Sequence, residues 1–286
     1  MNFRTDLTLE RAELASENLK GLKKEFKHSD YTNTVIIDIE DEETAEKLGK
    51  ATGRYITVEI PDLTYATSDI SDITDAVKNA LDLLLPKKDG LVLVAGVGNS
   101  DITADALGPF VATGIFSTRH LTKELQQSIG FYEPLRPVSS ISTGVLGQTG
   151  LESSEYIKSI VNEIKPAFVI TIDALASRSI KRLGKTIQMS DTGIAPGSGI
   201  NNKRKRIDES YLGVPVIAIG VPTVVDALTL VENISGENGN LKTDFDMIVT
   251  PKDIDVLTKN ASQLIATAIN LSLQKTLTYE DLKSLL

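Results

Sequence analysis

Residues 90–99 read GLVLVAGVGN, and this stretch decides the fold. A continuous apolar run that ends in glycines is typical of a parallel β-strand covered on both faces. Two further runs have the same character: residues 167–172 (AFVITI), which lead into Asp173, and residues 214–220 (VPVIAIG). We therefore predict a buried strand at each of these three places.

The segments around these runs show apolar residues at helical spacing. The predicted helices cover residues 69–85, a segment from Asp105 or Ala106 towards Gln127, residues 157–164 and residues 253–275. Strands that alternate with helices imply βαβ units. The predicted fold class is therefore α/β, a doubly wound, mostly parallel sheet flanked by helices, in a single α/β domain over residues 1–286.

Two parts of the chain look like small additions to that sheet. At the N-terminus, residues 8–28 predict a polar helix, residues 42–52 a short helix, and residues 34–39 and 54–60 two strands. The second addition is the stretch around 184–212. Neither part resembles a linker between domains.

Composition limits the possible functions. The 286 residues include no cysteine, which excludes disulfides, thiolate catalysis and cysteine-based metal sites. The net charge of −9 argues against direct binding of nucleic acid through a general basic surface. Because the sequence shows no apolar signal core and no membrane-spanning run, we expect a cytoplasmic protein without a membrane partner.

Two aspartates are candidates for chemistry because ligands of open parallel sheets bind beyond the carboxyl ends of the strands. Asp173 follows a buried strand directly, and a partly desolvated carboxylate there could have a raised pKa. Asp105 follows the glycine turn of the first strand, and Asp101 is an equal alternative on spacing alone. Each aspartate could instead cap the helix that follows it. If the two strands are neighbours, Asp105 and Asp173 could share the acid and base roles of amide hydrolysis.

A nucleotide site is disfavoured at the glycine turn. Gly96 and Gly98 are followed by Asp101 rather than by the third glycine of a dinucleotide fingerprint, and no lysine completes a phosphate-binding loop. Acidic residues there would also repel a pyrophosphate.

Other polar residues are weaker candidates. Ser198, in a Gly-Ser-Gly stretch, could be a nucleophile, but His28 and His120 stand in no recognisable triad. The basic run 203–206 is either a solvated loop or a contact with substrate or another subunit.

Beyond these residues, several segments resemble, in order along the chain, those of the bacterial spore germination proteases. The segments are residues 4–7 (RTDL), 99–109 (NSDITADALGP), 147–152 (GQTGLE), 172–179 (IDALASRS), 190–199 (SDTGIAPGSG), 202–205 (NKRK), 213–227 (GVPVIAIGVPTVVDA) and 249–252 (VTPK). The resemblance implies a hydrolase, an endopeptidase that degrades the small acid-soluble proteins coating spore DNA during germination. It also implies a homotetramer in the spore core, made as a zymogen and without a cofactor.

The resemblance further implies that Asp105 and Asp173 are catalytic, and it selects Asp105 over Asp101. In the family, a short segment is removed just before the motif that begins here at Arg4, and only Met1 to Phe3 precede that motif in this sequence. We therefore expect either an already mature form or a member that needs no such processing.

The same turn and carboxylates are also similar to those of hydrogenase-maturation endopeptidases. In that family the carboxylates act with a histidine on a metal of the substrate, and no histidine stands in a corresponding motif here. Carboxylates alone can hold hard cations, so a metal-dependent hydrolase is an alternative prediction. A protein that only binds the spore coating proteins is a third.

Overall fold

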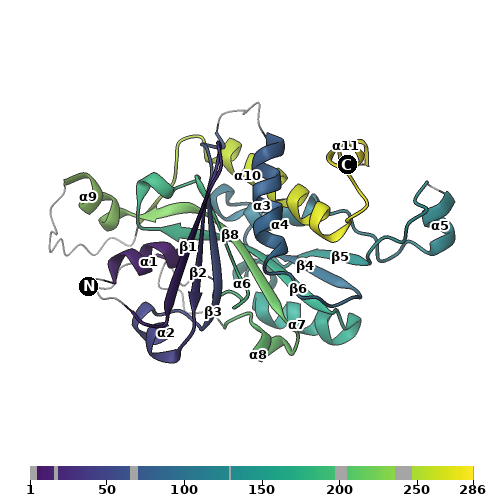
Figure 1. The fold of residues 1–286 in the computed structure, drawn as a ribbon, viewed down its shortest axis with the longest axis horizontal. Helices are drawn as coiled ribbons and strands as arrows, with labels where there is room; N and C mark the ends of the chain where they lie inside the picture. Colours follow the sequence, from purple (N-terminus) through teal and green to yellow (C-terminus); the bar gives the residue numbers. More distant parts are fainter. Residues whose placement is uncertain are drawn as a thin grey trace.

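We describe a computed structural model over residues 5–15, 19–64, 70–128, 130–196, 205–235 and 247–285 (Figure 1). Within these residues, nine strands form one sheet in the order β1-β2-β3-β7-β8-β6-β4-β5, and β9 pairs with β8. The strands are β1 (Leu22–His28), β2 (Asn33–Ile39), β3 (Gly53–Glu59), β4 (Val92–Gly96), β5 (Val138–Ser142), β6 (Phe168–Ser177), β7 (Thr186–Ser190), β8 (Val216–Asp226) and β9 (Ile248–Val249).

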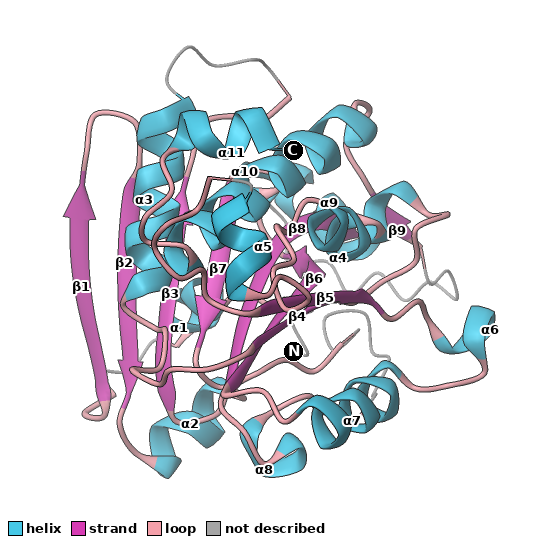
Figure 2. Ribbon diagram, turned by 90° about the vertical axis from the view of Figure 1, so that its right-hand side faces the viewer, coloured by secondary structure: helices cyan, strands magenta, loops and turns pink. Residues whose placement is uncertain are grey.

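Helices cover the sheet, so the predicted α/β class is confirmed (Figure 2). The α-helices are α1 (Thr8–Leu14), α2 (Glu42–Leu48), α3 (Ile70–Asp82), α4 (Leu107–Thr113), α5 (Lys123–Ser128), α6 (Leu146–Thr149), α7 (Ser153–Ile164), α8 (Glu209–Leu212), α9 (Ala227–Ser235), α10 (Ile254–Leu273) and α11 (Tyr279–Leu285). Two 3-10 turns, η1 (Thr103–Asp105) and η2 (Ile180–Arg182), complete the described elements. No helix in the described ranges has the length and apolar character needed to cross a membrane.

Parallel pairing is confined to four strands, β5, β4, β6 and β8. The other pairs are antiparallel: β1, β2 and β3 form a meander, β7 joins this meander to β8, and β9 pairs with β8. The sheet is therefore mixed rather than mostly parallel. The two predicted additions, the N-terminal part and the stretch around 184–212, supply the antiparallel strands β1, β2, β3 and β7.

The apolar run of residues 90–99 is buried on both faces of the sheet, as expected. Val92 and Val94 pack into the core cluster that includes Ile265 of α10, whereas Leu93 packs into a second cluster that includes Ile157 of α7. Successive side chains of a strand point to opposite faces, so a strand between two helical layers must be apolar at every position.

The predicted polar helix over residues 8–28 is wrong. Among the residues of this segment that the structure describes, Thr8–Leu14 is helical, and Leu22–His28 forms the edge strand β1, which pairs with β2. The residues of β1 after Leu22 are exposed and mostly charged. Charged residues protect an edge strand from pairing with other chains, and this pattern is easily taken for the solvated face of a helix.

Three predicted boundaries also move. The helix expected from Asp105 towards Gln127 is divided into η1, α4 and α5. The two strands predicted to end near residues 172 and 220 continue to Ser177 and Asp226. β6 therefore continues beyond Asp173, and β8 continues beyond Gly220, the residue that pairs with Asp173.

Candidate active site

Asp173 lies inside β6 rather than beyond its end. It pairs in register with Gly220 of β8 and is 4% exposed, and its Oδ1 accepts the Ala174 N–H at 3.0 Å. Because the strand continues through residues 174–177, no helix follows that Asp173 could cap. The helix-cap interpretation of this residue is therefore wrong.

Asp105 closes the 3-10 turn η1 and is half-buried. Its Oδ2 accepts the N–H of Asn99 at 2.8 Å, so the carboxylate points back across the glycine turn. Helix α4 begins at Leu107 with Ala106 at its N-cap and without a side-chain cap. Asp105 therefore caps no helix, and its carboxylate holds the turn after β4 in place.

Two glycines, Gly98 and Gly108, allow segments of main chain to pack closely at this turn. Gly98 has a φ of 125°, and a Cβ on this residue would overlap the carbonyl of Asp105. A Cβ on Gly108, at the start of α4, would overlap the main chain of Val97 and lie 2.6 Å from the Ile172 carbonyl oxygen. Only glycine permits this packing, which draws η1 against the ends of β4 and β6.

One cavity of about 220 Å³ is lined by both predicted residues, Asp105 and Asp173. Its wall also includes Val97, Ala174 and Thr223. The cavity lies beyond Gly96, the last residue of β4, which is where an α/β sheet places its ligands. The structure thus brings to one place two carboxylates that are 68 residues apart in the chain.

Asp101 is separated from this cavity. It is exposed, its N–H donates to the Asn99 Oδ1 at 2.9 Å, and its Oδ2 accepts from Gln148 at 3.0 Å. Among the residues described, Asp105 is the aspartate of this loop that lines the cavity. The spacing of the sequence could not make that distinction.

Two cavity residues with polar side chains, Asp6 and Thr223, were not predicted as site residues. The N–H of Asp6 donates to the Ala176 carbonyl at 2.9 Å, and its Oδ2 accepts the Ala176 N–H at 2.9 Å. Thr223 is fully buried in β8 and donates its hydroxyl to the Ala104 carbonyl at 2.6 Å, which fixes η1. The only sequence signal for Asp6 was its place in the RTDL segment.

A smaller cavity of about 140 Å³ adjoins the first and shares Asp6 and Asp173 with it. Three cationic side chains line it: Arg11, Lys50 and Arg206. The Lys50 ammonium donates to the Asp6 carbonyl at 2.6 Å. Burial lowers the pKa of Lys50 to about 8, although the negative charge of Asp6 opposes the shift.

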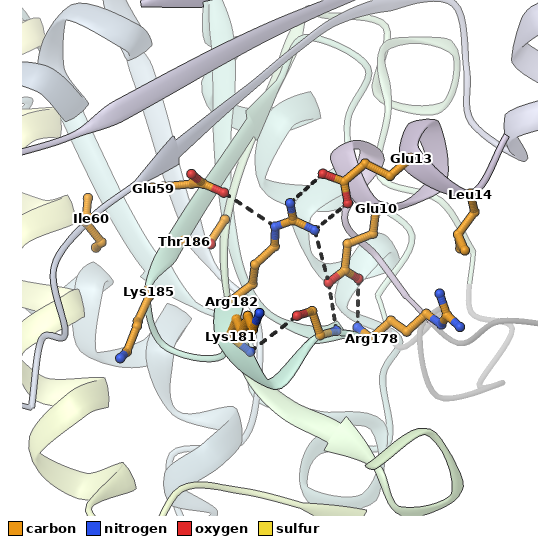
Figure 3. A pocket seen from close by; sticks show the side chains of 11 residues that line it. Glu10, Glu13, Leu14, Glu59, Ile60, Arg178, Lys181, Arg182, Lys185 and Thr186 are labelled. Carbon is orange, nitrogen blue, oxygen red and sulfur yellow. Dashed lines mark hydrogen bonds and ion pairs between the residues drawn. The ribbon is translucent and has the colours of Figure 1, made fainter. Parts of the chain in front are cut away.

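A third cavity, about 700 Å³, lies elsewhere and is lined by charged residues of α1, β3 and the segment after β6 (Figure 3). Its central contact is the Arg182 guanidinium, which makes two hydrogen bonds to Glu13, at 2.6 and 2.7 Å. Arg182 also lies 3.8 Å from Glu10 and 3.5 Å from Glu59. These side chains pair with one another, so we assign them a structural role and place the chemistry at the aspartates.

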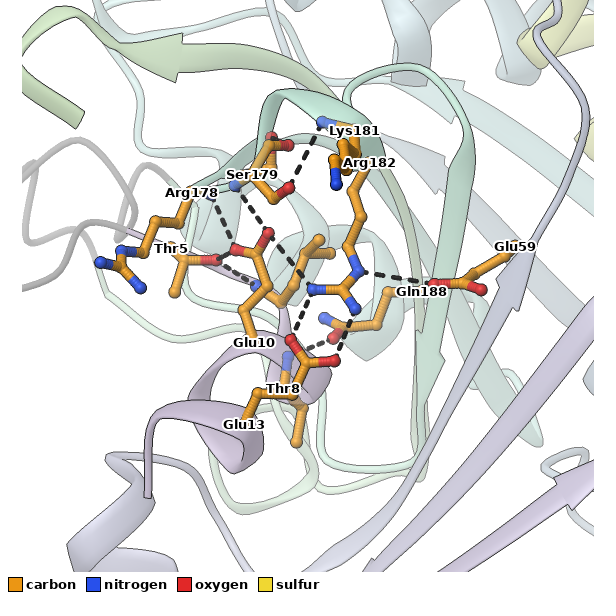
Figure 4. A network of polar contacts seen from close by, with 12 residues as sticks. Thr5, Thr8, Glu10, Glu13, Glu59, Arg178, Ser179, Lys181, Arg182 and Gln188 are labelled. Atoms are coloured by element: carbon orange, nitrogen blue, oxygen red, sulfur yellow. Dashed lines mark hydrogen bonds and ion pairs between the residues drawn. The ribbon is translucent and has the colours of Figure 1, made fainter. Parts of the chain in front are cut away.

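Glu10 is the buried centre of the same network (Figure 4). It is 3% exposed and accepts the N–H groups of Arg178 at 2.7 Å and Ser179 at 2.8 Å, and also the hydroxyl of Thr5. These contacts tie the N-terminal segment to the residues that follow β6. They therefore hold Asp6 beside the strand that carries Asp173.

Of the remaining candidates, Arg206 lines the smaller cavity, and the others that the structure describes line neither of the two cavities. Ser198, Lys203 and Arg204 lie outside the described residues. His28 is on the exposed strand β1, where its Nδ1 is 2.8 Å from the Asn33 Oδ1, and His120 is exposed in the loop after α4. Among the described residues, no group of three His, Cys, Asp or Glu side chains is placed to hold a metal ion.

The fold is thus an α/β sheet with two carboxylates in one cavity, and comparison with known proteins identifies the family. The family model for germination proteases matches residues 4–235. The chain belongs to the germination protease family.

Relatives of known name agree over the whole chain. The germination protease of Caldanaerobacter subterraneus subsp. tengcongensis is 41% identical, with 100% of this chain and 98% of that protein covered. The germination protease of Clostridium tetani is 40% identical with full coverage of both chains. The resemblance in the sequence is therefore confirmed, and the protein is an endopeptidase of spore germination.

Among solved structures, a NiFe hydrogenase maturation protease HycI from Thermococcus kodakarensis KOD1 is similar over 66% of this chain and 98% of its own. The TM-score is 0.37 and the identity 17%.

Proposed function

We propose that this germination protease hydrolyses the peptide bond of its substrate with Asp105 and Asp173 as a general acid–base pair. The observation that carries the proposal is the shared cavity, in which a half-buried carboxylate and a nearly fully buried one come from separate elements. In this proposal the pair carries a single proton, because two neighbouring carboxylates disfavour each other's ionised form.

That single proton suits both halves of the reaction. The ionised member takes a proton from water, whose oxygen attacks the carbonyl carbon of the peptide bond. The protonated member donates its proton to the departing amine nitrogen, so the pair ends with one proton again. The proposal assigns the acid and base roles to the pair rather than to one named residue.

The test compares three purified variants, Asp105→Asn, Asp173→Asn and Asp101→Asn, on a small acid-soluble spore protein. Removal of an acid–base group lowers the rate by about 10²–10⁴-fold, so the first two variants should lose cleavage while retaining their circular dichroism spectra. Asp101→Asn is the matched control because it removes an exposed carboxylate from the same loop, and it should cleave normally. Full activity of Asp105→Asn or Asp173→Asn would reject the pair.

The same assay separates the alternative functions. Loss of cleavage on chelation, with recovery on addition of a divalent cation, would favour a metal-dependent hydrolase that uses the same carboxylates. A stable complex without fragments would favour a protein that only binds its target.

The natural substrate, assembly and location are parts of the same proposal. We propose that residues 1–286 act as one peptidase domain, that the substrates are the small acid-soluble proteins that coat spore DNA, and that the enzyme is a homotetramer in the spore core. The family to which the chain belongs supports the germination role, and its net charge of −9 suits a partner other than DNA. Light scattering of the purified chain tests the tetramer.

A further inference from the structure

Strand β8 contains one residue that has no counterpart in the neighbouring strand β6. Leu175 of β6 pairs with Pro222 of β8. The next residue of β6, Ala176, pairs with Val224, so Thr223 is an extra residue in β8, a β-bulge. A bulge interrupts the regular ladder and can re-aim a side chain, and bulges are common next to active sites.

The side chain of this extra residue contacts the turn that carries Asp105. The Thr223 hydroxyl donates to the Ala104 carbonyl at 2.6 Å, and Thr223 is fully buried, so the hydrogen bond is shielded from solvent. The Thr223 carbonyl accepts the hydroxyl of Thr250 at 2.9 Å, which holds the main chain of the bulge. The bulge is therefore fixed itself, and its hydroxyl binds the residue directly before Asp105.

The same strand also holds the other carboxylate. Gly220, three residues before Thr223, pairs in register with Asp173. Thr223 lines the cavity of about 220 Å³ together with Asp105 and Asp173. β8 therefore contacts the segments that carry both aspartates, one through strand pairing and the other through a single side-chain hydroxyl.

We propose that Thr223 is a positioning residue for peptide hydrolysis, and that its hydroxyl fixes Asp105 at the distance from Asp173 that catalysis needs. This inference rests on the proposed acid–base pair and adds a residue that acts through it. It assigns a purpose to the bulge, because the bulge is the feature that brings the hydroxyl to the Ala104 carbonyl.

The other hydrogen bonds of Asp105 are local to its turn. Its N–H donates to the Ile102 carbonyl at 2.7 Å, and its Oδ2 accepts the N–H of Asn99 at 2.8 Å. These bonds shape the turn, whereas the Thr223 hydroxyl joins the turn to the sheet that carries Asp173. A misplacement of about 1 Å in an active site can lower a rate about 10²-fold, so a small shift of the turn is enough to impair the pair.

The test uses two pairs of enzymes that differ by the hydroxyl at residue 223. The wild type is compared with Thr223→Val, in which a methyl group replaces the hydroxyl, and Thr223→Ser is compared with Thr223→Ala. In each pair, loss of the hydroxyl should lower kcat for cleavage of a small acid-soluble spore protein by about tenfold or more. KM should change by less than about threefold, because the hydroxyl is bonded within the protein rather than to substrate.

Thr74→Val is the matched control. Thr74 is also buried and donates its hydroxyl to a carbonyl, that of Ile70, at 2.6 Å, but it lies in α3 and lines neither of the two cavities that contain Asp173. Its kcat should equal that of the wild type. Circular dichroism at the assay temperature shows that each variant is folded, so that a fall in kcat is not a loss of folded enzyme.

The size of the hydroxyl effect decides the outcome. A difference in kcat of less than about twofold within either pair would overturn the positioning role. If Thr223→Val does not fold, the comparison of Thr223→Ser with Thr223→Ala decides alone. Asp105→Asn and Asp173→Asn are assayed in parallel, and full activity of either would instead reject the proposed acid–base pair.

Discussion

Replacement of the buried Glu10 by glutamine should destabilise the protein far more than the same change at the neighbouring Glu13. Glu10 accepts two backbone N–H groups, from Arg178 on Oε2 and Ser179 on Oε1. In a glutamine, one of these oxygens becomes an NH₂ group that faces another donor. A buried N–H left without an acceptor costs about 1–3 kcal/mol, and loss of the negative charge near Arg182 adds to this. We therefore expect Glu10→Gln to lower the free energy of unfolding by about 2–4 kcal/mol.

Glu13→Gln is the matched control. Glu13 binds the same Arg182 but is 48% exposed, and an exposed ion pair contributes only about 0–1 kcal/mol. Urea unfolding followed by far-ultraviolet circular dichroism measures both variants, since the chain contains no tryptophan for fluorescence. Equal free energies of unfolding for the two variants would show that the buried network does not anchor the N-terminal segment, and the assigned role of Glu10 would be refuted.

Two further predictions concern the site. Because the pKa of Lys50 is lowered from 10.5 to about 8 in the folded protein, the unfolded chain binds more protons between these values. Urea titrations at a series of pH values measure the free energy of unfolding of the wild type and of Lys50→Met. The difference, wild type minus Lys50→Met, should rise between about pH 8 and about pH 10. A difference that stays constant over this range would contradict the lowered pKa. In Gly108→Ala, the added methyl group meets the backbone of Val97 and Ile172. Overpacking of a core costs about 1–3 kcal/mol, and we expect this variant to lose at least that much stability. Its urea midpoint should fall well below that of the exposed control Gly147→Ala, where a Cβ meets nothing within 4 Å, and equal midpoints would contradict the close approach.

The strands β4, β6 and β8 were predictable because their signal is local. A strand buried on both faces needs apolar residues at consecutive positions, and residues 90–99 and 167–172 show this in the sequence alone. The polar edge strand β1 shows no such pattern, because its side chains are exposed and therefore need not be apolar. Its strand character comes from pairing with β2, which is a contact between residues rather than a property of one segment.

The sequence by itself determined the α/β class, the family and the two aspartates that family implies, Asp105 and Asp173. Only the tertiary structure decided that Asp173 lies within a continuing strand, that Asp105 rather than Asp101 lines the cavity, and that Asp6 joins them. The hydrogen bond that places Asp6 beside Ala176 joins residues 170 positions apart. Periodicity reports which side of a segment is buried, whereas the meeting of distant side chains depends on strand order and register, which long-range pairing alone sets.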